Sequence, residues 1–237
     1  MRSFKRSIAL LAIFAPACAF AHHGTRFILA VEYDMVRQPF FFLNSTFSHF
    51  QDGDSLLMEP AVVLPIGRDG LSEFEVHAHI EKEGAEALRH EATGFEFRHH
   101  FIKGKGWNLA GALEYETTEK NVEEPNNWTG TLIVGKTDSR GIFLINFLEN
   151  QEAEHGAKLQ PGYRLAYSPT PTGPMDYSIE AQGDLIKHGS HELAFGIEGH
   201  LNPNMMVKFG IGFGLNSDSP RYAIHLGLVH ALGPIKE

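Results

Sequence analysis

A two-residue alternation of apolar and small or polar side chains recurs along most of this chain. In MMVKFGIGFGLN, residues 205–216, one parity carries only large apolar side chains, whereas the other includes three glycines, a lysine and an asparagine. Successive side chains of a strand point to opposite faces, so this pattern predicts a strand with one apolar face and one narrow, polar face. A helix would scatter the same residues around its surface.

Segments with this period follow one another, each roughly ten residues long and bounded by Gly, Pro, Asn or Asp, as in membrane barrels. No stretch after residue 21 shows a sustained helical period. The sequence therefore predicts an all-β fold. The expected strands are 40–49, 55–66, 71–81, 89–101, 106–117, 127–137, 140–149, 157–167, 174–187, 190–201, 204–216 and 220–232.

The connections between these segments alternate between tight and longer ones. Every second connection is a tight turn such as GRDG, KGKG, TDSR or NPN, and three of the others, EKEGAEA, TTEKNVEEPNN and ENQEAEHG, are longer and acidic. This alternation is typical of a transmembrane β-barrel with periplasmic turns and external loops. We therefore expect an antiparallel transmembrane β-barrel of about 12 strands, with 10 or 14 as alternatives and both termini in the periplasm.

Two further properties favour a membrane barrel over a soluble one. The mean hydropathy is only −0.18, as expected if half of each strand faces a polar lumen. Aromatic residues lie toward the strand ends, where membrane barrels carry interfacial girdles: Trp107, Trp128, Tyr167, Tyr177 and Tyr222. The alternative is a secreted β-sandwich or a soluble periplasmic barrel, whose apolar faces would point inward.

The first 21 residues have the features of a secretory signal peptide. A positive start is followed by an apolar run and by small residues at cleavage spacing, with cleavage expected after Ala19 or Ala21. The only cysteine, Cys18, lies in this segment. We therefore divide the chain into a signal peptide (1–21), an N-terminal segment that is periplasmic or lumenal (22–39) and a barrel domain (40–237). The net charge of −9 argues against a nucleic-acid partner.

The stretch RFILAVEYD, residues 26–34, has more than one reading. Counting it as a strand would give thirteen strands, whereas single-chain bacterial barrels have an even number. It is either a segment in the lumen or at the periplasmic mouth, or a true strand in place of 40–49.

The layout as a whole resembles bacterial outer-membrane β-barrel proteins, and the last strand carries a more specific match. These proteins end in a strand patterned polar-x-Gly-x-x-aromatic-x-apolar, and in HLGLVHAL the matching positions are His225, Gly227, His230 and Leu232. His230 replaces the usual aromatic residue, and GPIKE extends beyond the expected end. Within this class the chain is similar to the small exported barrels grouped with the MetA phenol-degradation pathway family.

That resemblance implies passage of small solutes across the outer membrane. The partners it implies are outer-membrane lipid and lipopolysaccharide, the secretion and barrel-assembly machinery, and small solutes.

Charged and histidine side chains gather on the parity that would face the lumen. The expected lumen-lining residues are Glu75, His77, His79, Glu96, Arg98, Glu114, Glu180, Glu198, His200, Lys208 and His225, with Glu59, Glu73, Glu116 and Asp184 on the same parity. An acidic, histidine-bearing lumen would favour cations. A network of paired charges that only fills a plugged barrel is the structural alternative.

His22 and His23 form a second candidate site near the expected start of the mature chain. A free amine, backbone amides and an imidazole suit a copper ion, which gives a soluble, metal-binding protein as a further alternative. G-x-S-x-G and phosphate-binding motifs are absent from the sequence, so we expect neither enzymatic activity nor a cofactor. The sequence thus predicts a passive outer-membrane channel for small solutes. The alternatives are a plugged structural or binding barrel with acidic external loops, and a periplasmic location.

Overall fold

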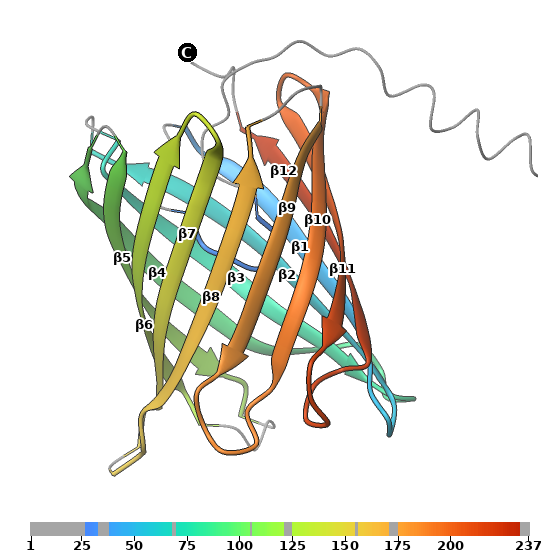
Figure 1. The fold of residues 1–237 in the computed structure, drawn as a ribbon. Helices are drawn as coiled ribbons and strands as arrows, with labels where there is room; N and C mark the ends of the chain where they lie inside the picture. Colours follow the sequence, from blue (N-terminus) through green and yellow to red (C-terminus); the bar gives the residue numbers. More distant parts are fainter. Residues whose placement is uncertain are drawn as a thin grey trace, which may run out of the picture.

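Twelve antiparallel strands follow one another around a closed barrel (Figure 1). The computed structural model describes residues 27–32, 38–67, 70–104, 106–120, 125–154, 156–170 and 175–232. Among them no helix is long and apolar enough to cross a membrane. The strands are β1 (Phe40–His49), β2 (Asp54–Ile66), β3 (Ser72–Glu83), β4 (Arg89–Lys103), β5 (Trp107–Thr118), β6 (Asn127–Asp138), β7 (Gly141–Glu152), β8 (Gln160–Pro169), β9 (Met175–Asp184), β10 (His191–Asn202), β11 (Met205–Gly214) and β12 (Tyr222–Ala231).

The barrel closes between its first and last strands. β1 pairs with β12 from Phe40 opposite Ala231 to His49 opposite Tyr222, so no strand is left with an unpaired edge. The prediction of an all-β, twelve-stranded antiparallel barrel is confirmed. Residues 27–32 form no strand, and 40–49 does, so the alternative that exchanged these two segments is wrong.

Three predicted strands, 174–187, 204–216 and 220–232, are clearly shorter than expected, and the first shows the largest difference. β9 ends at Asp184, and the chain turns back through residues 185–190, where His188 adopts a positive φ of 64°. The Asp184 N–H donates to the Ser190 carbonyl, which closes this turn. Asp184, expected on the lumenal face, is consequently exposed at the end of the barrel.

The two ends of the barrel carry connections of different length. β1 begins and β12 ends at one end, and the strands are connected there by residues 67–71, 104–106, 139–140, 170–174 and 203–204. The opposite end, which we call the loop end, carries the connections 50–53, 84–88, 119–126, 153–159, 185–190 and 215–221. Short turns of transmembrane barrels face the periplasm, so we assign the end with Phe40 and Ala231 to the periplasm.

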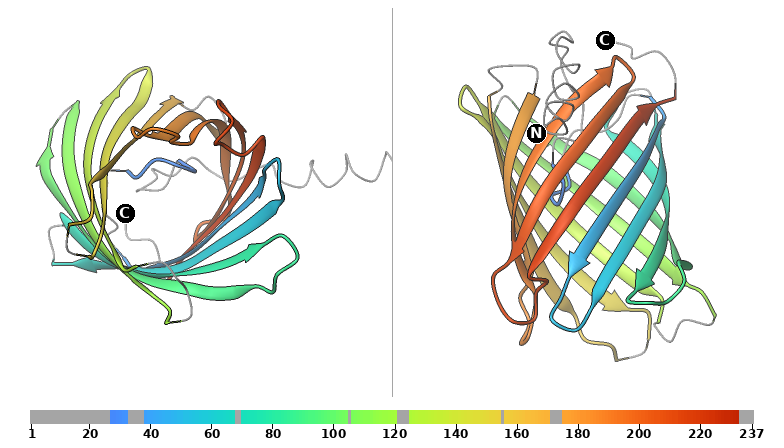
Figure 2. Two further views of the ribbon diagram at one scale, coloured as in Figure 1. Left: turned by 90° about the horizontal axis from the view of Figure 1, so that it is seen from below. Right: turned by 90° about the vertical axis from the view of Figure 1, so that its right-hand side faces the viewer.

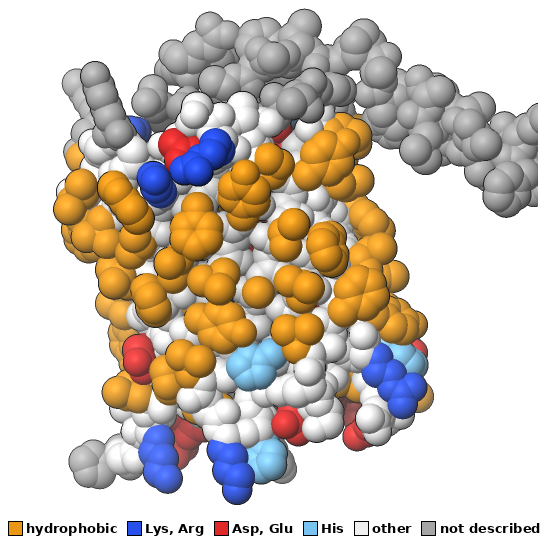
Figure 3. Space-filling model, viewed as in Figure 1, with side chains coloured by type: hydrophobic (Ala, Val, Ile, Leu, Met, Phe, Trp, Pro, Cys, Tyr) orange, Lys and Arg blue, Asp and Glu red, His pale blue; other side chains and the backbone are white. Residues whose placement is uncertain are grey.

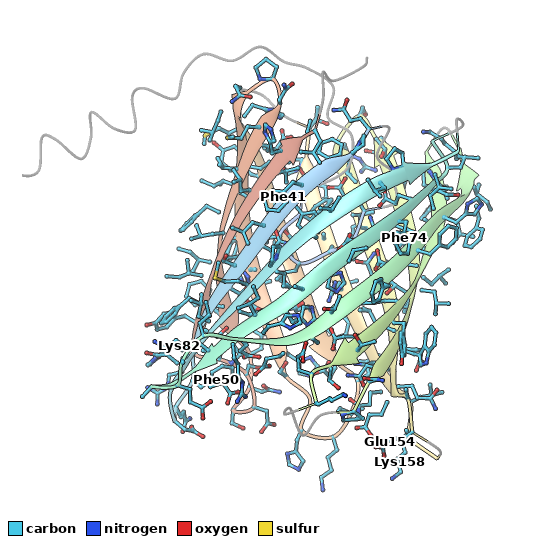
Figure 4. The ribbon with its side chains drawn as sticks, turned by 180° about the vertical axis from the view of Figure 1, so that it is seen from behind. Phe41, Phe50, Phe74, Lys82, Glu154 and Lys158 are labelled. Atoms are coloured by element: carbon cyan, nitrogen blue, oxygen red, sulfur yellow. The ribbon has the colours of Figure 1, made fainter. Side chains whose placement is uncertain are left out.

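The outer wall of the barrel is apolar. Figure 3 shows hydrophobic side chains in a broad band over the wall, with charged side chains mainly near the two ends. On β11 the alternate residues Phe209, Ile211 and Phe213 are exposed, whereas Gly210 and Gly212 between them and Lys208 before them are buried. In Figure 4, Phe41 and Phe74 lie on the wall, and Lys82, Glu154 and Lys158 lie at the loop end. The alternative of a soluble barrel, whose apolar side chains would face the interior, is therefore wrong. An apolar outer surface is the surface that a barrel presents to lipid.

Aromatic side chains mark both ends of the apolar band. Trp107, Tyr167 and Tyr177 are exposed at the end assigned to the periplasm, and Trp128 and Tyr222 at the loop end. Tryptophan and tyrosine favour the membrane–water interface because their rings are amphipathic. The two girdles expected from the sequence are present.

Candidate functional site

A short N-terminal segment lies inside the barrel, against the inner wall (Figure 2). The segment consists of residues 27–32, and we call it the docked segment. The Glu180 carboxylate on β9 accepts hydrogen bonds from the backbone N–H groups of Ile28, Leu29 and Ala30 at 2.8, 2.7 and 3.0 Å. Glu180 is only 1 % exposed and also accepts from the Ser178 hydroxyl at 2.7 Å. A carboxylate with several donors is satisfied although it is buried.

Two other inward side chains hold the ends of the docked segment. Asn146 on β7 bonds Val31 twice: its Oδ1 accepts from the Val31 N–H at 2.8 Å, and its Nδ2 donates to the Val31 carbonyl at 2.9 Å. Lys208 on β11 donates from Nζ to the Phe27 carbonyl at 2.6 Å. The segment thus exchanges its backbone hydrogen bonds with side chains of the wall instead of with a neighbouring strand.

Small residues of the wall make room for the docked segment. A Cβ on Gly210 would overlap the Ile28 side chain, and one on Gly196 of β10 would contact it. Phe27 and Ala30 pack into a buried apolar cluster with inward residues of β5 to β8: Ala110, Ile133, Leu144 and Ala166. Gly210 of the MMVKFGIGFGLN strand therefore allows close approach of a second piece of chain.

The opposite wall, on β2 to β5, is charged. Arg98 on β4 lies 2.7 Å from Glu73, 2.6 Å from Glu96 and 3.8 Å from Glu75. The Arg98 side chain is 14 % exposed, so a single cation neutralises part of the charge of three carboxylates in a mostly buried setting. We call the inward charged side chains of β2 to β5 the acidic wall; they are Glu59, Glu73, Glu75, His77, His79, Glu96, Arg98, Glu114 and Glu116.

Two histidines continue the acidic wall toward the loop end. His77 Nδ1 lies 3.0 Å from Glu75, and His77 Nε2 lies 3.0 Å from Glu114. The neighbouring His79 contacts Glu59 at 3.2 Å and Glu116 at 2.8 Å. Across the whole wall, six carboxylates face one arginine and two imidazoles, so the wall is negative even when both imidazoles are protonated.

A smaller polar group lies on the inner face of β9, β10, β12 and β1. His225 on β12 lies 2.8 Å from the Glu192 carboxylate of β10, and Thr46 Oγ1 lies 3.1 Å from the other ring nitrogen. Gln182 donates to Glu192 at 2.9 Å. These contacts leave Glu192 satisfied although it is buried.

Between the docked segment and the acidic wall lies a cavity of about 550 Å³. Its lining includes eight of the eleven residues expected in the lumen: Glu75, His77, His79, Glu96, Arg98, Glu114, Lys208 and His225. Of the other three, Glu180 lies beneath the docked segment, Glu198 is buried on β10, and His200 is half-buried toward the periplasmic end of the same strand.

Several lining residues were not expected from the sequence. Arg164, Gln182 and Glu192 border the cavity, and Asn146 holds the docked segment. Each has the inward parity of its strand, so alternation alone could have identified them.

Some predicted sites fall elsewhere. His22, His23 and the expected signal peptide lie outside the described residues. Of the four expected insertion-signal residues, His225 and Gly227 border the cavity, His230 lies near the periplasmic end of β12, and Leu232 follows that strand.

No known protein-family model and no curated protein sequence matches the chain. Solved structures with a similar fold include the COG4313 outer-membrane channel from Pseudomonas putida F1, with a TM-score of 0.65 and 6% identity over 85% of this chain and 98% of that one. The KdgM porin in complex with disordered oligogalacturonate matches with a TM-score of 0.59 and 9% identity, over 82% and 99% of the two chains. The NanC porin matches with a TM-score of 0.59 and 7% identity, over 81% and 100%.

At these sequence identities the comparisons show similarity of fold alone. The chain shares the architecture of small outer-membrane β-barrel channels, and its apolar exterior supports the expected location in the outer membrane. The narrower resemblance to the MetA pathway family stays a prediction.

Proposed function

We propose that the protein is a passive outer-membrane channel for small solutes and that it prefers cations. The observation that carries this proposal is the cavity bounded on one side by the acidic wall. Carboxylate-lined pores raise the local concentration of cations and repel anions, most strongly where the surroundings exclude bulk water. The docked segment narrows the lumen from the other side, so the passage suits ions and small molecules.

The acidic wall also argues against one class of solute. Oligogalacturonate, bound in one KdgM porin structure, is an acidic sugar chain, and the carboxylates of this lumen would repel such a ligand. A neutral or cationic solute fits the lining better.

Conductance of the purified protein in planar bilayers under a KCl gradient tests the proposal. We expect a reversal potential of the sign set by potassium. Replacing Glu75, Glu96 or Glu114 by Gln should reduce this selectivity, whereas E154Q removes the same charge from an exposed loop residue outside the lumen and should not. Anion selectivity of the parent protein would contradict the charge argument.

A plugged structural or binding barrel is a second candidate, favoured by the docked segment itself. In that case a folded barrel, recognised by its heat-dependent gel mobility, would show no conductance above the lipid background. In this alternative the acidic connections at the loop end would bind the partner.

Two sequence predictions remain proposals with tests of their own. Mass determination of the exported protein would locate the signal cleavage site. Copper titration of the parent protein and of H22A would test the terminal copper site.

A further inference from the structure

Two histidines of β3 are stacked on the lumenal face. His77 and His79 are two positions apart, so both side chains point inward; their ring centroids lie 5.1 Å apart with an interplanar angle of 20°. Gly94 of β4 lies opposite His77, and a Cβ there would overlap the His77 ring. Because β4 carries no side chain at this point, the imidazole reaches across it toward β5.

The two imidazoles contact carboxylates from three strands. Glu75 of β3 and Glu114 of β5 flank His77, and Glu59 of β2 and Glu116 of β5 flank His79. Four carboxylates around two imidazoles leave an excess of negative charge, whatever the protonation of the rings. A divalent cation would offset this excess.

One imidazole nitrogen has an unusual environment. His77 is 9 % exposed, and its Nε2 is buried. Glu114 Oε1 lies 3.0 Å away, but within the described part of the chain no acceptor or donor meets hydrogen-bond geometry with this nitrogen. A buried nitrogen without a directed hydrogen bond calls for an explanation, and a bound ion is one of them.

We propose that His77, His79 and Glu116 form a lumenal binding site for a divalent transition-metal ion such as Zn²⁺. One ligand atom from each of the three lies within 4.8 Å of the others. Metal–ligand bonds of about 2.0–2.2 Å put the ligand atoms of a tetrahedral site roughly 3.3–3.6 Å apart. Side-chain rotations that close the cluster by about 1 Å complete the site, with water or a neighbouring carboxylate in the fourth position.

The donor set selects the class of ion. Imidazole nitrogen suits zinc, copper and nickel, whereas calcium and magnesium prefer oxygen ligands throughout. With His77 Nε2 as the ligand atom, Glu75 lies 3.0 Å from His77 Nδ1, and Glu59 lies 3.2 Å from His79 Nε2. These two carboxylates would accept from the ring N–H groups, as carboxylates do around metal-bound histidines. Binding releases any proton held on the coordinating nitrogens.

The site borders the same cavity as the acidic wall, so its role deepens the proposed function and rests on it. A metal ion held there lies beside the conduction path. Zinc should therefore reduce the current of monovalent cations at concentrations that fill the site.

The experiment uses the untagged barrel, purified in detergent, with Zn²⁺ as the probe and calorimetric titration as the first readout. We expect one zinc site per barrel whose affinity falls at least tenfold in H77Q and in H79Q. H90Q is the matched control: His90 also pairs with a glutamate, Glu119, but at the exposed loop end. H22A/H23A removes the predicted terminal copper site and should leave the lumenal site in place. Cobalt substitution adds a second readout, because tetrahedral Co²⁺ with imidazole ligands absorbs strongly in the visible range.

Heat-dependent gel mobility verifies that each variant is folded. Zinc affinity that is absent, or unchanged in both H77Q and H79Q, would overturn the site. Zinc binding lost in these variants, in a barrel that conducts no ions, would support the site and refute the channel. Conductance without zinc binding would support the channel and refute the site.

Discussion

Docking of residues 27–32 depends on one buried carboxylate, and the variant E180Q tests that dependence. Glu180 accepts three backbone N–H bonds from the docked segment at 2.7–3.0 Å and one hydroxyl bond from Ser178. Glutamine has nearly the same volume, so the barrel wall is not disturbed. One of its two terminal atoms is an NH₂ donor, which cannot accept from a backbone N–H.

The magnitude follows from the number of bonds lost. Hydrogen bonds to charged groups contribute about 1.5–3 kcal/mol each, and E180Q removes at least one of them. At about 1.4 kcal/mol per factor of ten, the undocked fraction of the segment rises roughly 10- to 150-fold.

Cysteine labelling measures that fraction. The only cysteine of the chain, Cys18, lies in the expected signal peptide, so I28C places a single thiol on the docked segment of the exported protein. Ile28 packs over Gly210 and Gly196, so the thiol should react with a maleimide mainly when the segment leaves the wall. We expect the labelling rate of I28C/E180Q to exceed that of I28C by the factor above, with higher conductance.

E192Q in the same I28C background is the control. Glu192 is also a buried carboxylate of the lumen, but it bonds His225 and Gln182. An equal labelling rate in I28C and I28C/E180Q, with unchanged conductance, would refute the reasoning that Glu180 holds the segment.

Three other substitutions test separate parts of the structure. In G210V the new side chain overlaps Ile28, so conductance should rise as in E180Q while heat-dependent mobility is kept; lower conductance would mean that the lumen is blocked instead. R98Q leaves three carboxylates without their shared cation and should lower the free energy of unfolding by up to about 3–5 kcal/mol, measured by urea titration in lipid vesicles; equal stability would show that water already screens the group. I211R puts a charge on the lipid-facing side of β11 and should destabilise the inserted barrel by about 2–4 kcal/mol in the same assay, whereas a neutral effect would contradict the lipid-facing assignment.

Strand number and face could be derived from the sequence because both depend on local periodicity. The alternation of Phe209 and Ile211 with Lys208 and Gly210 identified the two faces of β11 before any partner strand was known. The end of β9 was harder to place, because Leu185 continues the apolar parity of Tyr177 and Ile179 although β9 ends at Asp184 and the chain turns through His188.

Most residues that face the lumen could also be predicted from the sequence, but the contacts between them could not. Parity puts Glu75 and His77 on the inner face, yet says nothing about which imidazole meets which carboxylate. That choice depends on the stagger of β3, β4 and β5 and on Gly94, which lets His77 reach Glu114 across a whole strand.

The sequence by itself determined that this chain forms an all-β barrel of about twelve strands around a charged interior, because a two-residue period and alternating turns are local properties. Only the tertiary structure decided what that interior contains. The docked segment bonds Glu180, Asn146 and Lys208, which follow it by more than 100 residues in the chain. The apolar composition of this segment does not distinguish a strand, a lipid-facing segment and a segment inside the lumen. Closure of the barrel supplies the partners for its backbone, and that is a property of the whole chain.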